Sequence, residues 1–403
     1  MGGTGVVAGG TAGSGRGVEP EPEPPGPGPA PQPASATAAI NTIIAFRGTV
    51  PQPRPARRLS SCGVKNVCLA CAAVLVREAV ETERRARPRR VWRRRVAVGV
   101  AVLFAAGTAV RLGGLEAGVF LVPMVSFTPY FALAALLVLG VVALLRSRAA
   151  IAIMLAVCAC LAWCVLPRAL GGGDASAGGR ALRVLTANLN GGRGDATVIV
   201  DLARRLNVDV LSIQELTYSA RDRLAAAGLA ELLPYHVGRA DFRGPEGSGV
   251  YSRHPMTERT GLFRPVGHHM PVVEVSLPGG SAVEVVVVHP VAPVPSTVPE
   301  WEAGLSALPP APASGPPRIL AGDFNATLDH AVFRRLLDTG YTDAAASTGQ
   351  GLTPTWPHGR SLPPLVAIDH VLTDGRGSAA GVQVFDVPGS DHRALFADLR
   401  IKG

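Results

Sequence analysis

Residues 318–325 read RILAGDFN, and this stretch decides the fold. A short apolar run leads directly into Asp323 and Asn325, so both polar side chains are expected where a buried strand leaves its sheet. Four other segments end in the same way: LRVLTAN in Asn188, VDVLSIQE in Glu215, VEVVVVHP in His289 and Pro290, and VAIDH in Asp369 and His370. Polar groups at the edge of a buried sheet commonly assemble a site. The pattern therefore predicts one shared pocket.

A further motif, SDH at residues 390–392, completes the set. With these motifs in this order, residues 182–401 resemble the endonuclease/exonuclease/phosphatase superfamily, which includes DNase I-like nucleases, inositol polyphosphate phosphatases and sphingomyelinases. The resemblance implies an α+β fold, a DNase I-like four-layer sandwich in which two mixed sheets are flanked by helices. It also implies hydrolysis of a phosphate ester or anhydride.

The resemblance further implies a role for each motif residue, with Mg²⁺ or Mn²⁺ as cofactor, since hard cations prefer oxygen ligands. The expected metal-binding residues are Glu215, Asn188 and Asp391; the expected catalytic residues are His289, Asp323, Asn325, Asp369 and His392; the expected substrate-binding residues are Asn188, Asn325 and Arg253. Asp369 is expected to fix the tautomer of His392, which acts as general base or as a donor to the phosphate. Which group handles the proton stays open. We expect His370 to pack in the core and His268 to lie on the surface or in a loop.

Hydrophobic patterning predicts the elements around these motifs. Strands are expected at 182–189, 208–214, 249–252, 272–277, 283–288, 318–321, 367–372, 382–385 and 394–399. Helices are expected at 195–206, 218–233 and 330–337, with a short one near Trp301.

Composition divides the chain into unlike parts. Residues 1–83, rich in Gly and Pro at the start, are expected to be disordered, because they offer little apolar surface to offset the entropy of ordering. Residues 84–95 carry eight arginines and are expected to be a cytoplasmic juxtamembrane segment. Residues 96–167 are predicted to form three transmembrane helices, residues 168–180 a linker, and residues 181–403 the catalytic domain.

The expected spans are 96–112, 124–145 and 149–167. The first is short, because Arg111 leaves only 15 uncharged residues before it, and a count of two spans is the alternative. Three spans place Arg146 and Arg148 on the cytoplasmic side, as the positive-inside rule favours, and put the catalytic domain outside. The chain is therefore expected to be a multi-pass membrane protein with an extracytoplasmic catalytic domain.

The charge distribution bears on the substrate. The chain has a net charge of +9, but residues 181–403 hold 19 basic and 22 acidic residues, so the basic excess lies outside the catalytic domain. A nuclease needs a cationic track for its polyanionic substrate, so nucleic acid is not favoured as a partner.

Three spans followed by this domain resemble the teicoplanin-resistance membrane proteins of the VanJ type. That layout implies a phosphorylated membrane lipid, such as a lipid pyrophosphate, as substrate. The alternatives are a membrane-tethered endonuclease and a phosphodiesterase like sphingomyelinase or phospholipase C. A non-enzymatic anchor protein would predict loss of the motif residues, and the set is complete.

Overall fold

The computed structural model describes residues 64–172, 178–242, 244–359 and 362–402. The residues from Leu75 to the end of the chain form one compact unit, and it holds every element described below except the start of the first helix. The expected disorder of residues 1–63 lies outside the described residues. Residues 64–83 belong instead to helix α1 (Val64–Gly113), which continues through the arginine-rich segment. The expected linker begins later than predicted, since helix α4 (Arg148–Leu170) extends to Leu170.

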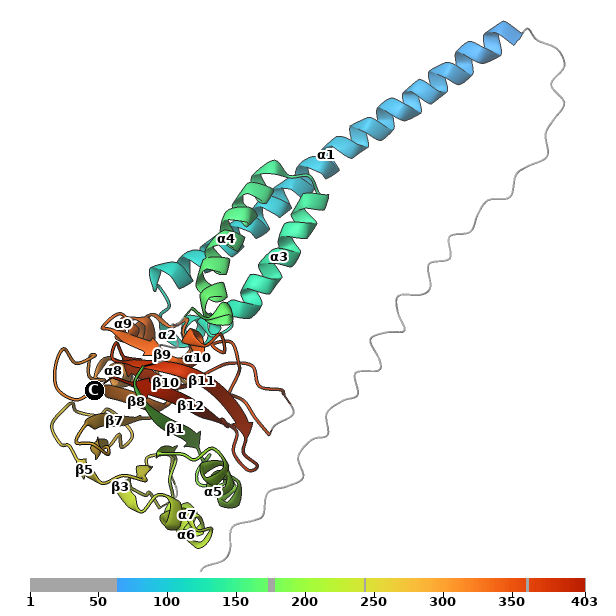
Figure 1. The fold of residues 1–403 in the computed structure, drawn as a ribbon. Coiled ribbons are helices and arrows are strands. Elements are labelled where there is room, and N and C mark those ends of the chain that lie inside the picture. The colour runs from blue at the N-terminus through green and yellow to red at the C-terminus, as the bar shows by residue number, and fades with distance from the viewer. Residues whose placement is uncertain (1–63, 173–177, 243, 360–361, 403) are drawn as a thin grey trace, which may run out of the picture. The chain divides into compact units, whose positions relative to one another are not determined.

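Four helices precede the sheets: α1, α2 (Gly118–Val125), α3 (Thr128–Leu144) and α4 (Figure 1). Two helices, Arg89–Gly113 and Arg148–Leu170, are long and apolar enough to cross a membrane, and α2 with α3 adds a third span if that bent pair counts as one. The pair bends by 77°, so the predicted span 124–145 is broken near its start. Pro123 inside α2 and a proline in the first turn of α3 favour the break.

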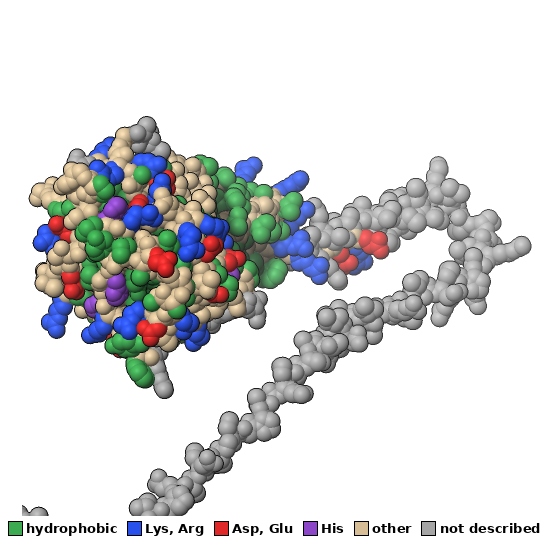
Figure 2. Space-filling view, turned by 60° about the horizontal axis from the view of Figure 1, so that its bottom comes forward, with side chains coloured by type: hydrophobic (Ala, Val, Ile, Leu, Met, Phe, Trp, Pro, Cys, Tyr) green, Lys and Arg blue, Asp and Glu red, His purple; other side chains and the backbone are tan. Residues whose placement is uncertain are grey.

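The apolar helices pack through small side chains. Ala97 and Ala101 of α1, Ala135 of α3, and Ala150 and Met154 of α4 are buried in one cluster. Their outward side chains are exposed and apolar, and Figure 2 shows hydrophobic side chains covering this helical surface, with Lys and Arg gathered beside it. A surface of this composition is typical of helices that face lipid.

The rest of the chain forms two six-stranded mixed sheets (Figure 1). The first has the order β11-β12-β1-β2-β4-β3 and comprises β1 (Arg180–Asn188), β2 (Val210–Gln214), β3 (Tyr235–Arg239), β4 (Ser248–Ser252), β11 (Gly377–Asp386) and β12 (Arg393–Ile401). The second has the order β5-β6-β7-β8-β10-β9 and comprises β5 (Met256–Glu258), β6 (Val272–Ser276), β7 (Ala282–Val288), β8 (Arg318–Asp323), β9 (Tyr341–Asp343) and β10 (Asp369–Asp374). Among the named strands of the described residues, β1–β2 and β7–β8 are the pairs that run in parallel.

Three buried clusters define four layers. The central cluster lies between the sheets and includes Val184, Val210, Val285 and Ile319. The outer face of the first sheet is covered by α5 (Ala196–Arg205), α6 (Tyr218–Ala226) and α7 (Leu229–Leu232). The outer face of the second is covered by α8 (Val298–Ser306), α9 (Ala331–Leu337) and Val122 of α2. The short helix α10 (Ala344–Ser347) follows β9. The expected sandwich of two mixed sheets flanked by helices is confirmed.

The strands that patterning missed share one property. Strands β3, β5 and β9 all lie at sheet edges, where one side is unpaired and short polar sequences such as YHVGR, MTE and YTD suffice. The helix expected over 218–233 is divided in two at Gly228, whose φ is 90°. The left-handed backbone at this glycine ends α6 before α7 begins.

Candidate active site

The predicted residues meet because their strands end at one edge of the sandwich. Asn188 and Asp323 are the last residues of β1 and β8, and Glu215 directly follows β2. In β10, Asp369 is the first residue and pairs with Asp323 across the antiparallel β8–β10 ladder. His392 directly precedes β12, which runs antiparallel to β1. Residues far apart in the chain therefore converge because the strands alternate in direction.

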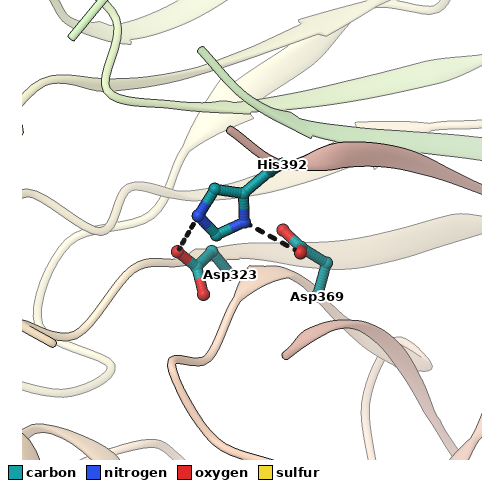
Figure 3. A group of neighbouring side chains, drawn as sticks. All are labelled: Asp323, Asp369 and His392. Carbon is teal, nitrogen blue, oxygen red and sulfur yellow. Dashed lines mark hydrogen bonds and ion pairs between the residues drawn. The ribbon is translucent and has the colours of Figure 1, made fainter. Parts of the chain in front are cut away.

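Asp323, Asp369 and His392 form a buried group (Figure 3). The Nδ1 atom of His392 lies 3.0 Å from Oδ2 of Asp369, and its Nε2 atom lies 3.7 Å from Oδ2 of Asp323. The imidazole thus lies between two carboxylates. The expected pairing of Asp369 with His392 is present, and Asp369 holds the ring with Nε2 directed at Asp323.

Asn188 connects this group to Glu215. Its Nδ2 atom donates to Oδ2 of Asp323 at 3.0 Å and to Oε1 of Glu215 at 3.1 Å. The second carboxylate oxygen of Glu215 accepts from the backbone N–H of Gly191. Glu215 has a φ of 56°, an uncommon value outside glycine, so the surrounding structure holds it in an unfavourable conformation.

Burial and neighbouring charges separate the acid–base properties of the group. Burial raises the pKa of Asp323 to about 7; the charge of His392 opposes this rise and that of Asp369 adds to it. Burial alone would lower the pKa of His392, but the charges of Asp369 and Asp323 outweigh it and raise the pKa to about 10. At neutral pH His392 is therefore a cation, while Asp323 is poised to take or release a proton.

His289 lies on the other side of Asp323. Its Nε2 atom is 3.9 Å from Oδ2 of Asp323 and 3.9 Å from Oε1 of Glu215. Its Nδ1 atom lies 3.2 Å from Nδ1 of His268. Burial, together with His268 and His392, holds the pKa of His289 well below its usual value. His289 is therefore neutral and can exchange hydrogen bonds without adding charge.

Asn325 is fixed beside the group by three hydrogen bonds. Its backbone N–H donates to Oδ1 of Asp323 at 2.8 Å, and its Nδ2 atom donates to the carbonyl of Pro290 at 3.1 Å. Its own carbonyl accepts from Nε1 of Trp301 on α8 at 3.0 Å. The GDFN turn and the segment after His289 are thus locked together.

One predicted residue, Arg253, stands apart from the group. Arg253 follows Ser252, which pairs with Val210 at the start of β2, whereas Glu215 follows the other end of that strand. Five residues of strand, roughly 16 Å, separate them. Arg253 donates instead to the carbonyl of Val208, so we retain no substrate contact for it. Asp391 adds to the charge that raises the pKa of His392, and its role as a metal-binding residue stays a prediction.

Two residues that sequence reasoning did not place in the site position the group. Ser390 Oγ donates to the carbonyl of Asn188 and accepts from the backbone N–H of His392. Thr355 is fully buried, and its Oγ1 accepts from the backbone N–H of Asp369. Ser390 in SDH offered a local signal, whereas the role of Thr355 depends on a contact across 14 residues.

His268 lies in a loop, as expected. Its side chain is half-buried, and its ring centroid lies 4.3 Å from that of His289, so it borders the site. By contrast, His370 packs against Phe324 and Phe333 as expected, and its Nδ1 atom lies 2.8 Å from the buried carboxylate of Asp343. The neighbours of both histidines come from segments far away in the chain, so the sequence alone does not show them.

The site suits a divalent cation. Glu215, Asp323 and Asp369 bring three carboxylates together, and among the described residues their ion pairs are with histidine alone. One protonated imidazole does not balance three acids. In addition, Oδ1 of Asp369 is buried without a hydrogen-bond partner. Excess negative charge and an unpartnered buried oxygen both fit a hard cation with oxygen ligands.

Comparison with known proteins agrees with this geometry. The model of the Endonuclease/Exonuclease/phosphatase family matches residues 185–392, slightly more than half of the chain. A comparison with curated proteins found no match.

Solved structures with a similar fold include three proteins. An endonuclease/exonuclease/phosphatase from Beutenbergia cavernae DSM 12333 is 21% identical, and the match covers 56% of this chain and 72% of that chain with a TM-score of 0.45. TDP2 from D. rerio, complexed with single strand DNA product, is 15% identical, with 55% of this chain and 99% of that chain covered and a TM-score of 0.43. An endonuclease/exonuclease/phosphatase family protein from Bacteroides thetaiotaomicron is 15% identical, with 56% of this chain and 99% of that chain covered and a TM-score of 0.40. These identities and TM-scores are low, so the assignment rests on the family model.

Proposed function

Because the chain belongs to the endonuclease/exonuclease/phosphatase family, whose members are generally phosphoesterase hydrolases, we propose that it is a membrane-anchored, divalent-metal-dependent phosphoesterase. The observation that carries this proposal is the buried group of Asp323, Asp369 and His392 at the strand ends, beside Glu215. A cation held by Glu215 and Asn188 would supply positive charge for the phosphoryl oxygens.

The electrostatics of the site suggest how its own residues divide the work. Asp323, with a pKa of about 7, accepts the proton of the attacking water. The protonated His392, held by Asp369, donates from Nε2 to a phosphoryl oxygen as negative charge develops. Neutral His289 and the amides of Asn188 and Asn325 orient the remaining oxygens. This assignment gives proton acceptance to Asp323 and stabilisation of the developing charge to His392, a choice that the sequence left open.

The helices support a membrane location. In α1, α3 and α4, buried side chains form one cluster, so the three helices run side by side. Helix α3 has 17 residues and is about 26 Å long, close to the roughly 30 Å of a hydrocarbon core. If α1 and α4 cross the membrane, α3 crosses with them. Three crossings from a cytoplasmic arginine cluster put the catalytic domain outside.

A lipid pyrophosphate is the substrate we favour. The anchor holds the site near lipid headgroups and so raises their effective concentration. The acidic balance of residues 181–403 gives no support for a long nucleic acid. A tethered endonuclease or a sphingomyelinase-like phosphodiesterase would use the same core residues, and they are the outcomes to test against.

The test uses the full chain in detergent micelles. Phosphate release from a polyprenyl pyrophosphate, nicking of plasmid DNA and cleavage of sphingomyelin are measured in parallel, with Mg²⁺ and with EDTA. We expect Mg²⁺-dependent hydrolysis of the lipid pyrophosphate alone. Glu215→Gln should abolish it, whereas Arg253→Gln, at the opposite end of β2, should leave it intact. Nicking of DNA with an untouched lipid would overturn the substrate assignment in favour of a nuclease.

The orientation is tested separately. The catalytic domain contains no cysteine, so Gln383→Cys on an exposed position of β11 gives it a single thiol. We expect this thiol to react in intact cells with a membrane-impermeant maleimide. Labelling only after the cells are lysed would refute an extracytoplasmic domain.

A further inference from the structure

An apolar pocket lies between α1, α2 and α3. Its volume is about 430 Å³, within the usual range of ligand pockets. The residues that line it include Val110 and Arg111 of α1, Leu121 and Met124 of α2, and Phe131 and Ala134 of α3; the guanidinium of Arg111 is already paired with Asp329. The catalytic residues contribute nothing to its walls. A hydrocarbon chain is the ligand that such a lining suits, because it offers few polar partners to any other group.

The position of α2 places this pocket at the membrane surface. Val122 of α2 is buried in the same cluster as Val288, which precedes His289, and Phe324, which lies inside GDFN. On the other side of α2, Phe120 and Met124 are 78% and 65% exposed. A helix with one face in the catalytic domain and an apolar face outward lies along the bilayer interface. One helix diameter, about 10 Å, therefore separates the lipid from the catalytic strands.

The pocket is connected to the catalytic segments on one side through Tyr130, which lines it. The hydroxyl of Tyr130 donates to the carbonyl of Leu365 at 2.8 Å. The loop that contains Leu365 begins at Thr355, which holds the backbone of Asp369. From the same loop, the backbone N–H of His358 donates to the carbonyl of Asp391.

A second connection runs through α2. The carbonyl of Val122 lies 3.0 Å from Nε2 of His330, whose ring packs edge-on against Trp301. Trp301 in turn donates to the carbonyl of Asn325. Two independent sets of contacts thus join the walls of the pocket to the segments that carry the catalytic residues.

We propose that this pocket holds the hydrocarbon chain of the substrate, so that the substrate is an amphiphilic phosphate whose head reaches the catalytic group from the membrane. The inference rests on the proposed function, since it names where the chain of that lipid lies. The bilayer supplies the amphiphile laterally, and the pocket selects molecules with a chain long enough to fill it. Water-soluble phosphates would reach the same catalytic group without using the pocket.

The kinetic test uses a variant whose larger side chain fills the pocket. Ala134→Phe places a ring in the cavity, and Leu133→Phe, on a neighbouring residue that is 62% exposed and outside the lining, is its matched control. The full chain is assayed in micelles on a long-chain polyprenyl pyrophosphate and on isopentenyl pyrophosphate. Displacing two methylene groups from the pocket should raise KM for the long-chain substrate about tenfold. Isopentenyl pyrophosphate and the control variant should show no change.

A binding test separates this inference from the proposed function. A polyprenyl phosphate with a photoreactive chain is cross-linked to the full chain, and the modified residues are identified by mass spectrometry. We expect cross-links on Leu121, Met124 and Phe131, and their loss in Ala134→Phe. Cross-links there without hydrolysis of any pyrophosphate would sustain the pocket and sink the proposed activity. Cross-links confined to outward residues such as Leu133, or equal KM values in both variants, would overturn the pocket.

Discussion

Asp329 joins the membrane helices to the catalytic domain, and its substitution gives the most decisive test of the fold. Its side chain is 1% exposed and lies four residues after Asn325. Oδ1 of Asp329 accepts from Nε of Arg111 at the end of α1 at 2.7 Å, and Oδ2 accepts from Nη2 of Arg168 near the end of α4 at 2.8 Å. One buried carboxylate thus neutralises cations from two separate helices.

Asp329→Asn removes the charge and keeps the shape. Removing one partner of a buried ion pair leaves an uncompensated charge and costs about 3–5 kcal/mol. For the unit Leu75–Gly403, each kcal/mol corresponds to roughly 1.5 °C in Tm, so a fall of roughly 4–7 °C is expected. Thermal unfolding of the full chain in detergent, followed by tryptophan fluorescence, measures it.

The chain provides a control with the same bond length and much less burial. In α5, Asp201 accepts from Nε of Arg205 at 2.7 Å, but both side chains are about half exposed. Such a pair contributes only about 0.3–0.5 kcal/mol, so Asp201→Asn should change Tm by no more than a degree or two. Equal shifts in the two variants would refute the argument from burial. Replacing Arg111, Arg168 and Asp329 together by Met, Met and Leu should recover most of the loss.

Three further outcomes follow from the structure. Asp369→Asn should lower kcat about 10²–10⁴-fold, and it should move the alkaline limit of any residual activity to lower pH, because the charge of Asp369 raises the pKa of His392; an unchanged pH profile would contradict this. Burial lowers the pKa of His370, but the carboxylate of Asp343 on β9 outweighs burial and raises it. The stabilisation that the protonated His370 gives the folded state is therefore complete below about pH 6.5 and is lost as pH rises through the folded pKa. The Tm difference between wild type and His370→Gln should shrink from pH 6 to pH 9. A Cβ at Gly322 would lie against the backbone of β7, so Gly322→Ala should prevent folding, as seen by loss of soluble full chain from micelles, whereas Gly375→Ala, in open space, should fold normally.

The core strands could be predicted from the sequence because each is marked by an apolar run within a short segment. Strand β7 in VEVVVVHP is largely buried on both faces, so its apolar run predicts a strand without any knowledge of the neighbouring strands. The edge strands β3, β5 and β9 carry no such run, and only pairing with a neighbour makes them strands. The same distinction explains the break in the middle span, since α2 is held by the catalytic domain through Val122 and not by its own periodicity.

The sequence by itself determined the family, the residues of the catalytic group and the apolar character of the helices, because each of these is written in a short segment. The tertiary structure decided which of those residues meet. It moved Arg253 to the far end of β2, set His268 beside His289, and buried Asp329 between two arginines. It also separated the pKa of Asp323 from that of His392. Burial and the distance between charges are properties of segments brought together across the chain, and no single segment contains them.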